Sequence, residues 1–272
     1  AYAGLDEDNP YTDEKPNYER DYKKGEYVIV NNYKNAGQNT DDNHKAILPR
    51  MWSTDGDHPV NYMKFTKPLE FRVKAEYADE KELTDIVSEF RAAYNAKRLE
   101  LEDYEKFIKE YGDYLDIDKP STADNLSFMV EYQFGYMYWR YLMWNFTGRQ
   151  NDKQGKYDLA DGNWLSGINF IDEIRLGSQE NLPSDMKNNK GRNVYFFLPF
   201  IIGLIGFFFH AKKDIKSFYV VLALFLFTGI ALKIYLNERP FEPRERDYAL
   251  VGSFYVFALW IGMGVYAIFD FL

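Results

Sequence analysis

Three long, uncharged apolar stretches near the C-terminal end most constrain how this chain can fold. They cover residues 194–211, 217–232 and 248–269. At ~1.5 Å per residue the first stretch would reach about 27 Å as a helix, close to the ~30 Å hydrocarbon core of a bilayer. None of the three leaves a polar face for water, so we expect three transmembrane helices. The alternative, buried core helices of a soluble protein, fits less well because such helices are usually shorter.

Charge is distributed unevenly along the chain. The net charge of −9 comes from residues 1–192, because residues 193–272 hold nearly equal numbers of acidic and basic side chains. We therefore predict a mainly α membrane protein, with three transmembrane helices plus an acidic, partly helical extracytoplasmic domain with little sheet. The predicted regions are an extended polar, tyrosine-rich segment (1–47), an extracytoplasmic domain (48–192) and a membrane domain (193–272) with helices at about 193–211, 217–236 and 248–270.

Lysines at the first membrane loop suggest an orientation. Lys212, Lys213 and Lys216 crowd the short loop after the first apolar stretch, and the positive-inside rule places such a loop in the cytoplasm. The acidic N-terminal region and the loop 237–247 would then both be extracytoplasmic. Three further cations, Lys187, Lys190 and Arg192, flank the first stretch on the other side and weigh against this orientation.

Several classes of function lack the residues they need. The acidic balance and the absence of a basic stripe argue against a nucleic-acid partner. The chain has no cysteine, which excludes disulfides, thiol nucleophiles and cysteine-bound metal centres. The three histidines lack metal-ligand spacing, and no glycine-rich phosphate loop or Gly-x-Ser-x-Gly motif is present. We predict no metal site and no evident cofactor, and the sequence identifies no catalytic residue.

The region before residue 127 contains two clear local signals. Residues 26–31 (EYVIVN) form a short strand candidate bounded by polar residues. Residues 79–111 carry apolar side chains at steps of three and four, which predicts two helices or one bent helix with Asp79 as a possible N-cap. The inward positions would be Leu83, Ile86, Val87, Phe90 and Tyr94, then Leu101, Tyr104, Phe107, Ile108 and Tyr111.

An aromatic helix is expected at about 127–147. Nine of the nineteen residues in FMVEYQFGYMYWRYLMWNF (128–146) are aromatic. A helix would align Gln133, Arg140 and Thr147 on one stripe. Because Glu131 and Arg140 lie near its middle, we expect it at the membrane interface or packed under the membrane helices rather than spanning the bilayer. A core helix of a soluble domain is the alternative.

Two polar segments are candidate binding sites. The first follows the aromatic helix, where polar side chains next to an aromatic plate could contact a sugar; its candidates are Arg140, Trp144, Arg149, Asn151, Asp152 and Trp164. The competing interpretation is a glycine helix stop followed by an Asn/Asp turn. The second is the loop 237–247, where arginines could bind a lipid-linked phosphate and acids could orient them; its candidates are Arg239, Arg244, Glu245, Arg246 and Asp247. Mutual Arg–Glu pairing is its alternative.

Five strings resemble a known family. They are LPRMWSTDGDHPVNYMKF (48–65), DNLSFMVEYQFGYMYWRYLMWNFTGRQND (124–152), GNWLSGINFID (162–172), NVYFFLPFIIGLIGFFFH (193–210) and YLNERPFEPRERDYALVGSFYVFALWIGMGV (235–265). Over roughly residues 48–265 the chain is similar to a bacterial family of large multi-pass membrane proteins. That family is classed with the protein O-mannosyltransferase-like glycosyltransferases of the GT-C superfamily.

The resemblance implies a location and a reaction. The chain would lie in the bacterial inner membrane with its N-terminal domain extracytoplasmic, and its partners would be membrane lipid and a lipid-linked sugar. The protein would move a sugar from a polyprenyl-phosphate donor to a protein or glycan acceptor. Such enzymes carry a key acidic residue in a first extracytoplasmic loop that nothing in this sequence matches, so we expect this chain to be a middle fragment. The alternative is a non-catalytic membrane subunit or scaffold of a larger cell-envelope complex, with other envelope membrane proteins as partners.

Overall fold

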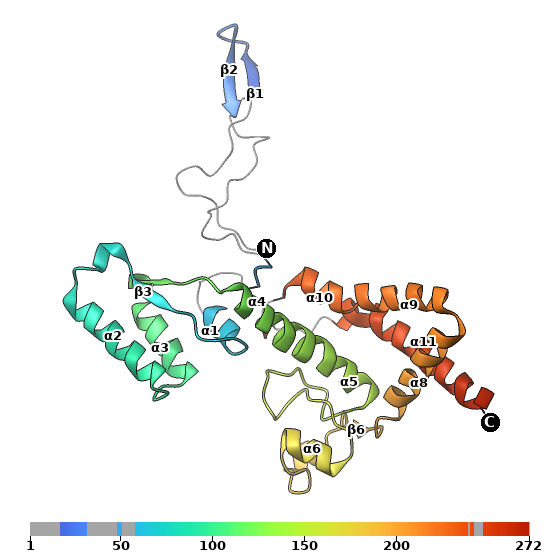
Figure 1. Cartoon of the computed structure of the whole chain (residues 1–272). Coiled ribbons are helices and arrows are strands. Elements are labelled where there is room, and N and C mark those ends of the chain that lie inside the picture. Colours follow the sequence, from blue (N-terminus) through green and yellow to red (C-terminus); the bar gives the residue numbers. More distant parts are fainter. Residues whose placement is uncertain (1–16, 32–47, 51–57, 239, 242–246, 272) are drawn as a thin grey trace. The chain divides into compact units, whose positions relative to one another are not determined.

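The computed structural model describes residues 17–31, 48–50, 58–238, 240–241 and 247–271. The chain divides into two compact units, Ala1–Leu126 and Ser127–Leu272 (Figure 1). The described residues are mainly helical and contain three small two-stranded sheets, which confirms the predicted helical class with little sheet. The predicted polar segment 1–47 is described only over residues 17–31.

Residues 17–31 form a hairpin rather than a fully extended segment. Strand β1 (Asn17–Asp21) pairs antiparallel with β2 (Glu26–Asn31), drawn in blue in Figure 1. The predicted strand over 26–31 is therefore confirmed. Gly25 closes the turn at φ 74°, in the left-handed region that glycine adopts without strain.

The rest of the first unit encloses an aromatic-rich core. Strand β3 (Phe71–Val73) pairs antiparallel with β4 (Leu115–Ile117), and the ring of Phe71 on β3 lies 5.6 Å from the rings of both Tyr104 and Phe107 on α3 (Leu101–Tyr111). Such pairs add to the free energy gained by burying the rings. The elements around this core are α1 (His58–Met63), β3 (Phe71–Val73), η2 (Ala75–Tyr77), α2 (Lys81–Asn95), α3 (Leu101–Tyr111), η3 (Gly112–Tyr114) and β4 (Leu115–Ile117).

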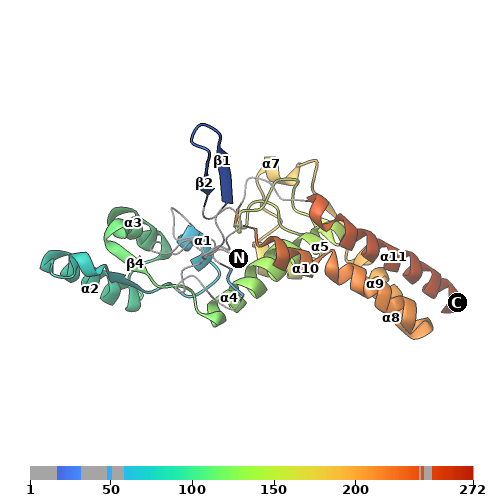
Figure 2. The same cartoon turned by 90° about the horizontal axis from the view of Figure 1, so that it is seen from above.

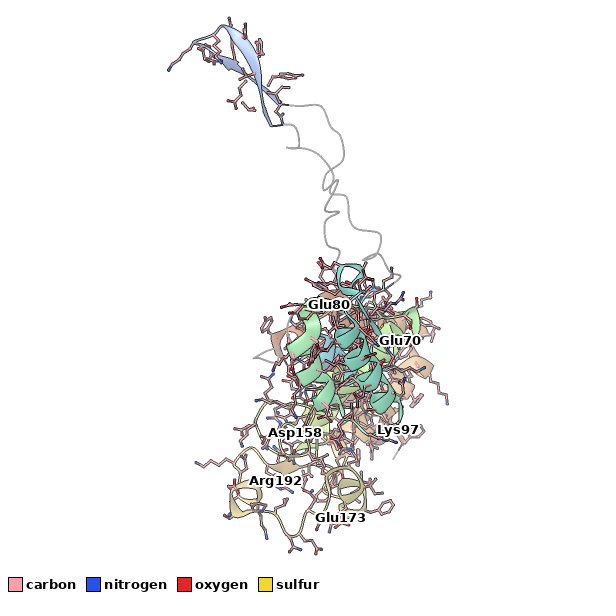
Figure 3. The ribbon with its side chains drawn as sticks, turned by 90° about the vertical axis from the view of Figure 1, so that its left-hand side faces the viewer. Glu70, Glu80, Lys97, Asp158, Glu173 and Arg192 are labelled. Atoms are coloured by element: carbon pink, nitrogen blue, oxygen red, sulfur yellow. The ribbon has the colours of Figure 1, made fainter. Side chains whose placement is uncertain are left out.

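The periodic pattern over residues 79–111 resolves into the two helices α2 and α3. Leu83 and Val87 of α2 are buried, as are Tyr104 and Phe107 of α3, and the other predicted inward positions pack against this core. The predicted N-cap at Asp79 is wrong, because Glu80 occupies the cap of α2 and makes no side-chain capping bond. Figure 3 looks onto this unit, with Glu80 before the first turn of α2 and Lys97 beyond its last.

In the second unit, the aromatic helix is continuous but changes pitch. Helix α4 (Thr122–Phe128), which begins in the first unit, leads into the π-helical segment η4 (Met129–Trp139), and α5 (Arg140–Phe146) completes the helix. Tyr138, Tyr141 and Leu142 pack with apolar side chains of the C-terminal helices. The predicted packing of this helix against the apolar C-terminal region is therefore observed.

The C-terminal helices depart from the three predicted ranges. The structure gives α8 (Leu198–Lys213), α9 (Ile215–Phe227), α10 (Ile230–Leu236) and α11 (Asp247–Phe271). By length and composition, two stretches could cross a membrane, Ile215–Leu236 and Tyr248–Phe271. Helix α8 begins later than predicted because β6 (Asn193–Val194) pairs with β5 (Gly148–Arg149), and Phe196 and Phe197 turn the chain with positive φ.

Glycines let α8 and α11 approach closely. The two helices lie along each other (Figure 2). A Cβ added at Gly206 would meet the carbonyl oxygen of Trp260 at 1.8 Å, and one at Gly264 would meet that of Ile202 at 1.9 Å. This backbone-to-backbone packing through small residues is typical of helices in lipid.

Candidate functional site

Most predicted sugar-cleft residues come together in one region of the second unit, which we call the polar loop cluster. It comprises residues 147–167 with the side chains of α5 and η4 that contact them. Arg140, one of the nominated residues, is 6% exposed. Its guanidinium donates to the carbonyl oxygens of Tyr136 and Gly162 and lies 4.4 Å from the centre of the Tyr136 ring. Arg140 therefore joins the aromatic helix to the loop.

Gly148 sets the path of the loop as it leaves the aromatic helix. Its φ is 144°, and an added Cβ would lie 2.5 Å from the Leu165 carbonyl oxygen and 2.6 Å from that of Asn193. Only a glycine lets three chain segments meet here. Helix α5 ends at Phe146 and Thr147 is its C-cap, so Gly148 follows the helix directly, close to the alternative interpretation of a glycine that stops the helix.

Two buried amides close the loop on itself. The amide NH₂ of Gln150 donates to the Leu159 carbonyl, and that of Asn163 donates to the Gln150 side-chain oxygen at 2.9 Å and to the carbonyls of Asp158 and Asp161. Gln150 is 3% exposed. Gln150 belongs to the polar run after the aromatic helix that was expected to contact a sugar, but nothing local in the sequence marks Gln150 and Asn163 as partners.

The side chain of Asn151 also makes its hydrogen bonds within the loop. Its NH₂ group donates to the Asp161 carboxylate at 2.8 Å and to the Ala160 carbonyl, while its oxygen accepts from the backbone N–H groups of Lys153 and Gly162. The indole N–H of Trp144 donates to the Asn151 carbonyl oxygen at 3.1 Å. The side-chain amide of Asn151 therefore closes the loop on itself, and its backbone carbonyl holds the loop against the helix. Asp152, the neighbouring candidate, is exposed and lies against Gly191.

Two arginines stack on the two nominated tryptophans. The guanidinium carbon of Arg149 lies 3.8 Å from the Trp144 ring centre, and that of Arg175 lies 3.4 Å from the ring centre of Trp164. A planar guanidinium suits such stacking better than an ammonium group does. Arg149 also donates to the Asn145 side-chain oxygen at 3.4 Å, whereas its buried Nε has no hydrogen-bond partner among the residues that the structure describes.

Arg175 and Asp172, both missed by the sequence interpretation, come from α6 (Asn169–Leu176). The Asp172 carboxylate is 2% exposed and accepts from the backbone N–H groups of Ser166 and Gly167, at 2.8 Å each, and from the Ser166 hydroxyl. Burial lowers the pKa of the Arg175 guanidinium to about 10, and the nearby Asp172 charge opposes part of that shift. The three-residue spacing of these opposite charges in INFIDEIR could have indicated a pair on one helix face.

The arginine-rich loop falls mostly outside the described residues, which exclude Arg239, Arg244, Glu245 and Arg246 and the side chain of Asp247. Its start is anchored to η4 and α10. Gln133 donates to the Asn237 side-chain oxygen at 2.9 Å, and the Tyr132 hydroxyl accepts from the backbone N–H of Phe241. Lys233 and Glu238 form an ion pair of 2.6 Å with both side chains buried.

The chemistry open to the polar loop cluster is limited. Within the described ranges, no three His, Asp or Glu side chains gather to hold a metal ion. The amides of Gln150, Asn151 and Asn163 are used internally, as is the guanidinium of Arg140. What the cluster offers a ligand is the Arg149–Trp144 stack.

Comparison with known protein families gives a match over part of the chain. The model of a family of unknown function, DUF8416, matches residues 1–130. That range covers the first unit and the first residues of the aromatic helix. No curated protein and no solved structure matches the chain.

Proposed function

We propose that this chain is a membrane-anchored structural subunit of a larger cell-envelope assembly. The observation that supports it most is the internal use of the polar residues nominated for substrate binding. Arg140 and Asn151 donate to carbonyl or carboxylate oxygens of the loop they hold, and both are more than nine-tenths buried. Hydrogen bonds of this kind fix a loop, because breaking one leaves a buried group without a partner. A fixed loop suits a binding platform for another protein.

The proposed anchor has three helices. Ile215–Leu236 and Tyr248–Phe271 are long enough to cross, and the sixteen-residue α8, packed on α11 through Gly206 and Gly264, would be the third span. Lys212 and Lys213 at the end of α8 favour a cytoplasmic turn between α8 and α9. The polar loop cluster would then lie at the extracytoplasmic surface of a bacterial inner membrane.

Extraction and copurification test this proposal. We expect the chain to stay with membranes after alkaline carbonate washing and to be released by mild detergent. In that detergent it should copurify with envelope membrane proteins at a fixed ratio. The variant Asn151→Ala, which loosens the loop cluster, should lower that ratio, whereas Lys187→Ala on the exposed surface should not. Release by carbonate, or a chain that elutes alone in mild detergent, would contradict the proposal.

A membrane glycosyltransferase using a polyprenyl-phosphate-linked sugar is a second candidate. It is favoured by one observation, the half-buried Arg149 guanidinium stacked on the half-buried Trp144 ring. A planar guanidinium beside an aromatic face could bind a phosphate or a sugar hydroxyl. In membranes supplied with labelled polyprenyl-phosphate sugar, Arg149→Lys should reduce transfer strongly and Arg192→Lys should not. Equal transfer by both variants and the unaltered chain would remove Arg149 from this role.

A further inference from the structure

Helix α6 is amphipathic in the reverse sense to a surface helix in water. Asp172 is 2% exposed and Arg175 is half-buried over the Trp164 ring, so two of the three charged residues of α6 face the protein, whereas Glu173 is exposed. Phe170 and Ile174, four residues apart and so on one helix face, are 73% and 72% exposed. A water-facing helix places its apolar stripe inward.

Hydrogen bonds of the inward-facing charged side chains prevent α6 from rotating about its axis. Both Asp172 carboxylate oxygens accept hydrogen bonds from the backbone just before α6, and Arg175 donates to the Trp164 carbonyl at 3.2 Å. Rotating α6 to bury Phe170 and Ile174 would break these bonds and leave buried donors unpaired. The outward apolar face is therefore held in place by the polar contacts behind it.

This face continues into the start of α8. An added Cβ at Gly167, directly before α6, would meet the side chains of Val194 and Phe196 at 2.9 Å, and the rings of Trp164 and Phe197 lie 5.8 Å apart. The turn before α8 and the start of α8 are also exposed and apolar, through the side chains of Tyr195, Phe196 and Leu198. In Figure 1, α6 lies beside this turn, next to β6. The side chain of Glu173 points away from the body of the unit (Figure 3).

We propose that α6 lies in the lipid–water interface, with Phe170 and Ile174 inserted among the acyl chains beside the entry of α8. The bilayer is the favoured occupant because the exposed apolar face of α6 continues into the apolar surface of a helix bundle that contains two stretches long enough to span, Ile215–Leu236 and Tyr248–Phe271. Short amphipathic helices with aromatic and branched apolar side chains bind at this depth. This inference rests on the proposed membrane anchor and adds to it a second, lateral contact with lipid.

Spin labels at single cysteines test the depth of α6, and the natural chain contributes no competing thiol. Phe170→Cys, Ile174→Cys, Glu180→Cys and Tyr255→Cys would each be labelled in vesicles of phosphatidylcholine and phosphatidylglycerol. The spin-label relaxation caused by oxygen, which concentrates in lipid, is compared with the spin-label relaxation caused by a water-soluble nickel complex. Tyr255 is an exposed position on α11 that reports the anchor itself, and Glu180 is the aqueous control.

We expect the ratio of oxygen accessibility to nickel accessibility at positions 170 and 174 to be several-fold higher than at position 180. It should approach the ratio at position 255. Nickel accessibility at 170 and 174 equal to that at 180 would overturn the inference while a high ratio at 255 preserved the membrane anchor. Exclusion of both reagents from 170 and 174 would also overturn it, because a protein would then cover the face. A low ratio at 255 would contradict the anchor itself.

Discussion

The indole nitrogen of Trp260 on α11 donates a hydrogen bond to Nδ1 of His210 on α8 at 3.2 Å. An indole N–H can only donate, so Nδ1 of His210 must accept. The neutral imidazole therefore carries its hydrogen on Nε2, which lies 2.7 Å from the Ser217 hydroxyl on α9. One buried histidine thus connects three helices of the apolar bundle, each through a defined hydrogen-bonding role.

Replacing Ser217 with Ala should destabilise this junction. The Nε2 hydrogen of His210 would lose its acceptor in a part-buried site, at a cost of about 1 kcal/mol in the free energy of unfolding. Thermal unfolding in mild detergent measures the effect. Ser253→Ala, which removes the bond between Ser253 and the Tyr138 hydroxyl elsewhere in the bundle, should add to it nearly independently. A Ser217→Ala variant as stable as the unaltered chain would contradict the assigned hydrogen position.

Gly206→Ala should separate α8 from α11. The new Cβ would overlap the Trp260 carbonyl oxygen, so the helices must move apart, and overpacking of this kind costs about 1–3 kcal/mol. Gly262→Ala is the matched control on α11, where no atom lies within 4 Å of the added Cβ. The control should be neutral or slightly stabilising, because alanine favours helix over glycine. Detergent melting curves that rank the two variants the other way would refute the close approach.

Gly148→Ala should loosen the polar loop cluster. Both its φ of 144° and its contacts with two carbonyl oxygens oppose a side chain. Gly177→Ala is the comparison, since Gly177 also has positive φ (78°) but open space around it, and it should lose only the cost of backbone strain, about 1–3 kcal/mol. Limited proteolysis of the loop 147–167 in detergent reports the difference. Cleavage at equal rates in both variants would indicate that the steric contacts do not matter.

The first unit should lose stability above pH 10. Burial raises the pKa of Tyr62 and of Tyr104 above the ordinary tyrosine value of 10.0, and each hydroxyl donates a buried hydrogen bond, to Asn125 and to the Leu69 carbonyl. The unfolded chain releases these protons near pH 10 while the folded chain keeps them. The stability they contribute is therefore complete below pH 10 and falls as pH rises from there.

Denaturant unfolding followed between pH 8 and 11 would show this decline, and tyrosinate absorbance would report ionisation at the same time. Tyr104→Phe removes one of the two phenols without emptying the core, so its stability should fall less steeply with rising pH. A variant whose decline matches that of the unaltered chain would assign the alkaline loss to other groups.

Local periodicity was enough to predict much of the helical structure. Steps of three and four over residues 79–111 predicted α2 and α3, because an amphipathic helix needs only its own stripe and any core to face. The strand over 26–31 was predicted from a short apolar run bounded by polar residues, and the apolar C-terminal helices from long uncharged runs. The stripe of Gln133, Arg140 and Thr147 was also predicted, and all three residues are buried.

Only part of the candidate site could be predicted from the sequence. The sequence indicated the right region, since six nominated residues fall in or beside the polar loop cluster. It did not indicate what each residue does there. Arg140 and Asn151 were expected to face a sugar, and their polar groups bind carbonyl and carboxylate oxygens, those of Gly162, Ala160 and Asp161 being far away in the sequence. Such pairings depend on which chain segments meet, and no residue type specifies a distant partner.

The sequence by itself determined where apolar helices form, since uncharged runs can satisfy their backbone only as helices in an apolar setting. Tertiary structure alone decided where α8 begins and which way α6 faces. The pairing of Gly148 with Val194 takes Asn193 and Val194 into a strand, and the bonds of Asp172 and Arg175 to the backbone around Ser166 turn Phe170 and Ile174 outward. Both outcomes arise from contacts between separate segments, because the energy of a hydrogen bond depends on where its partner lies.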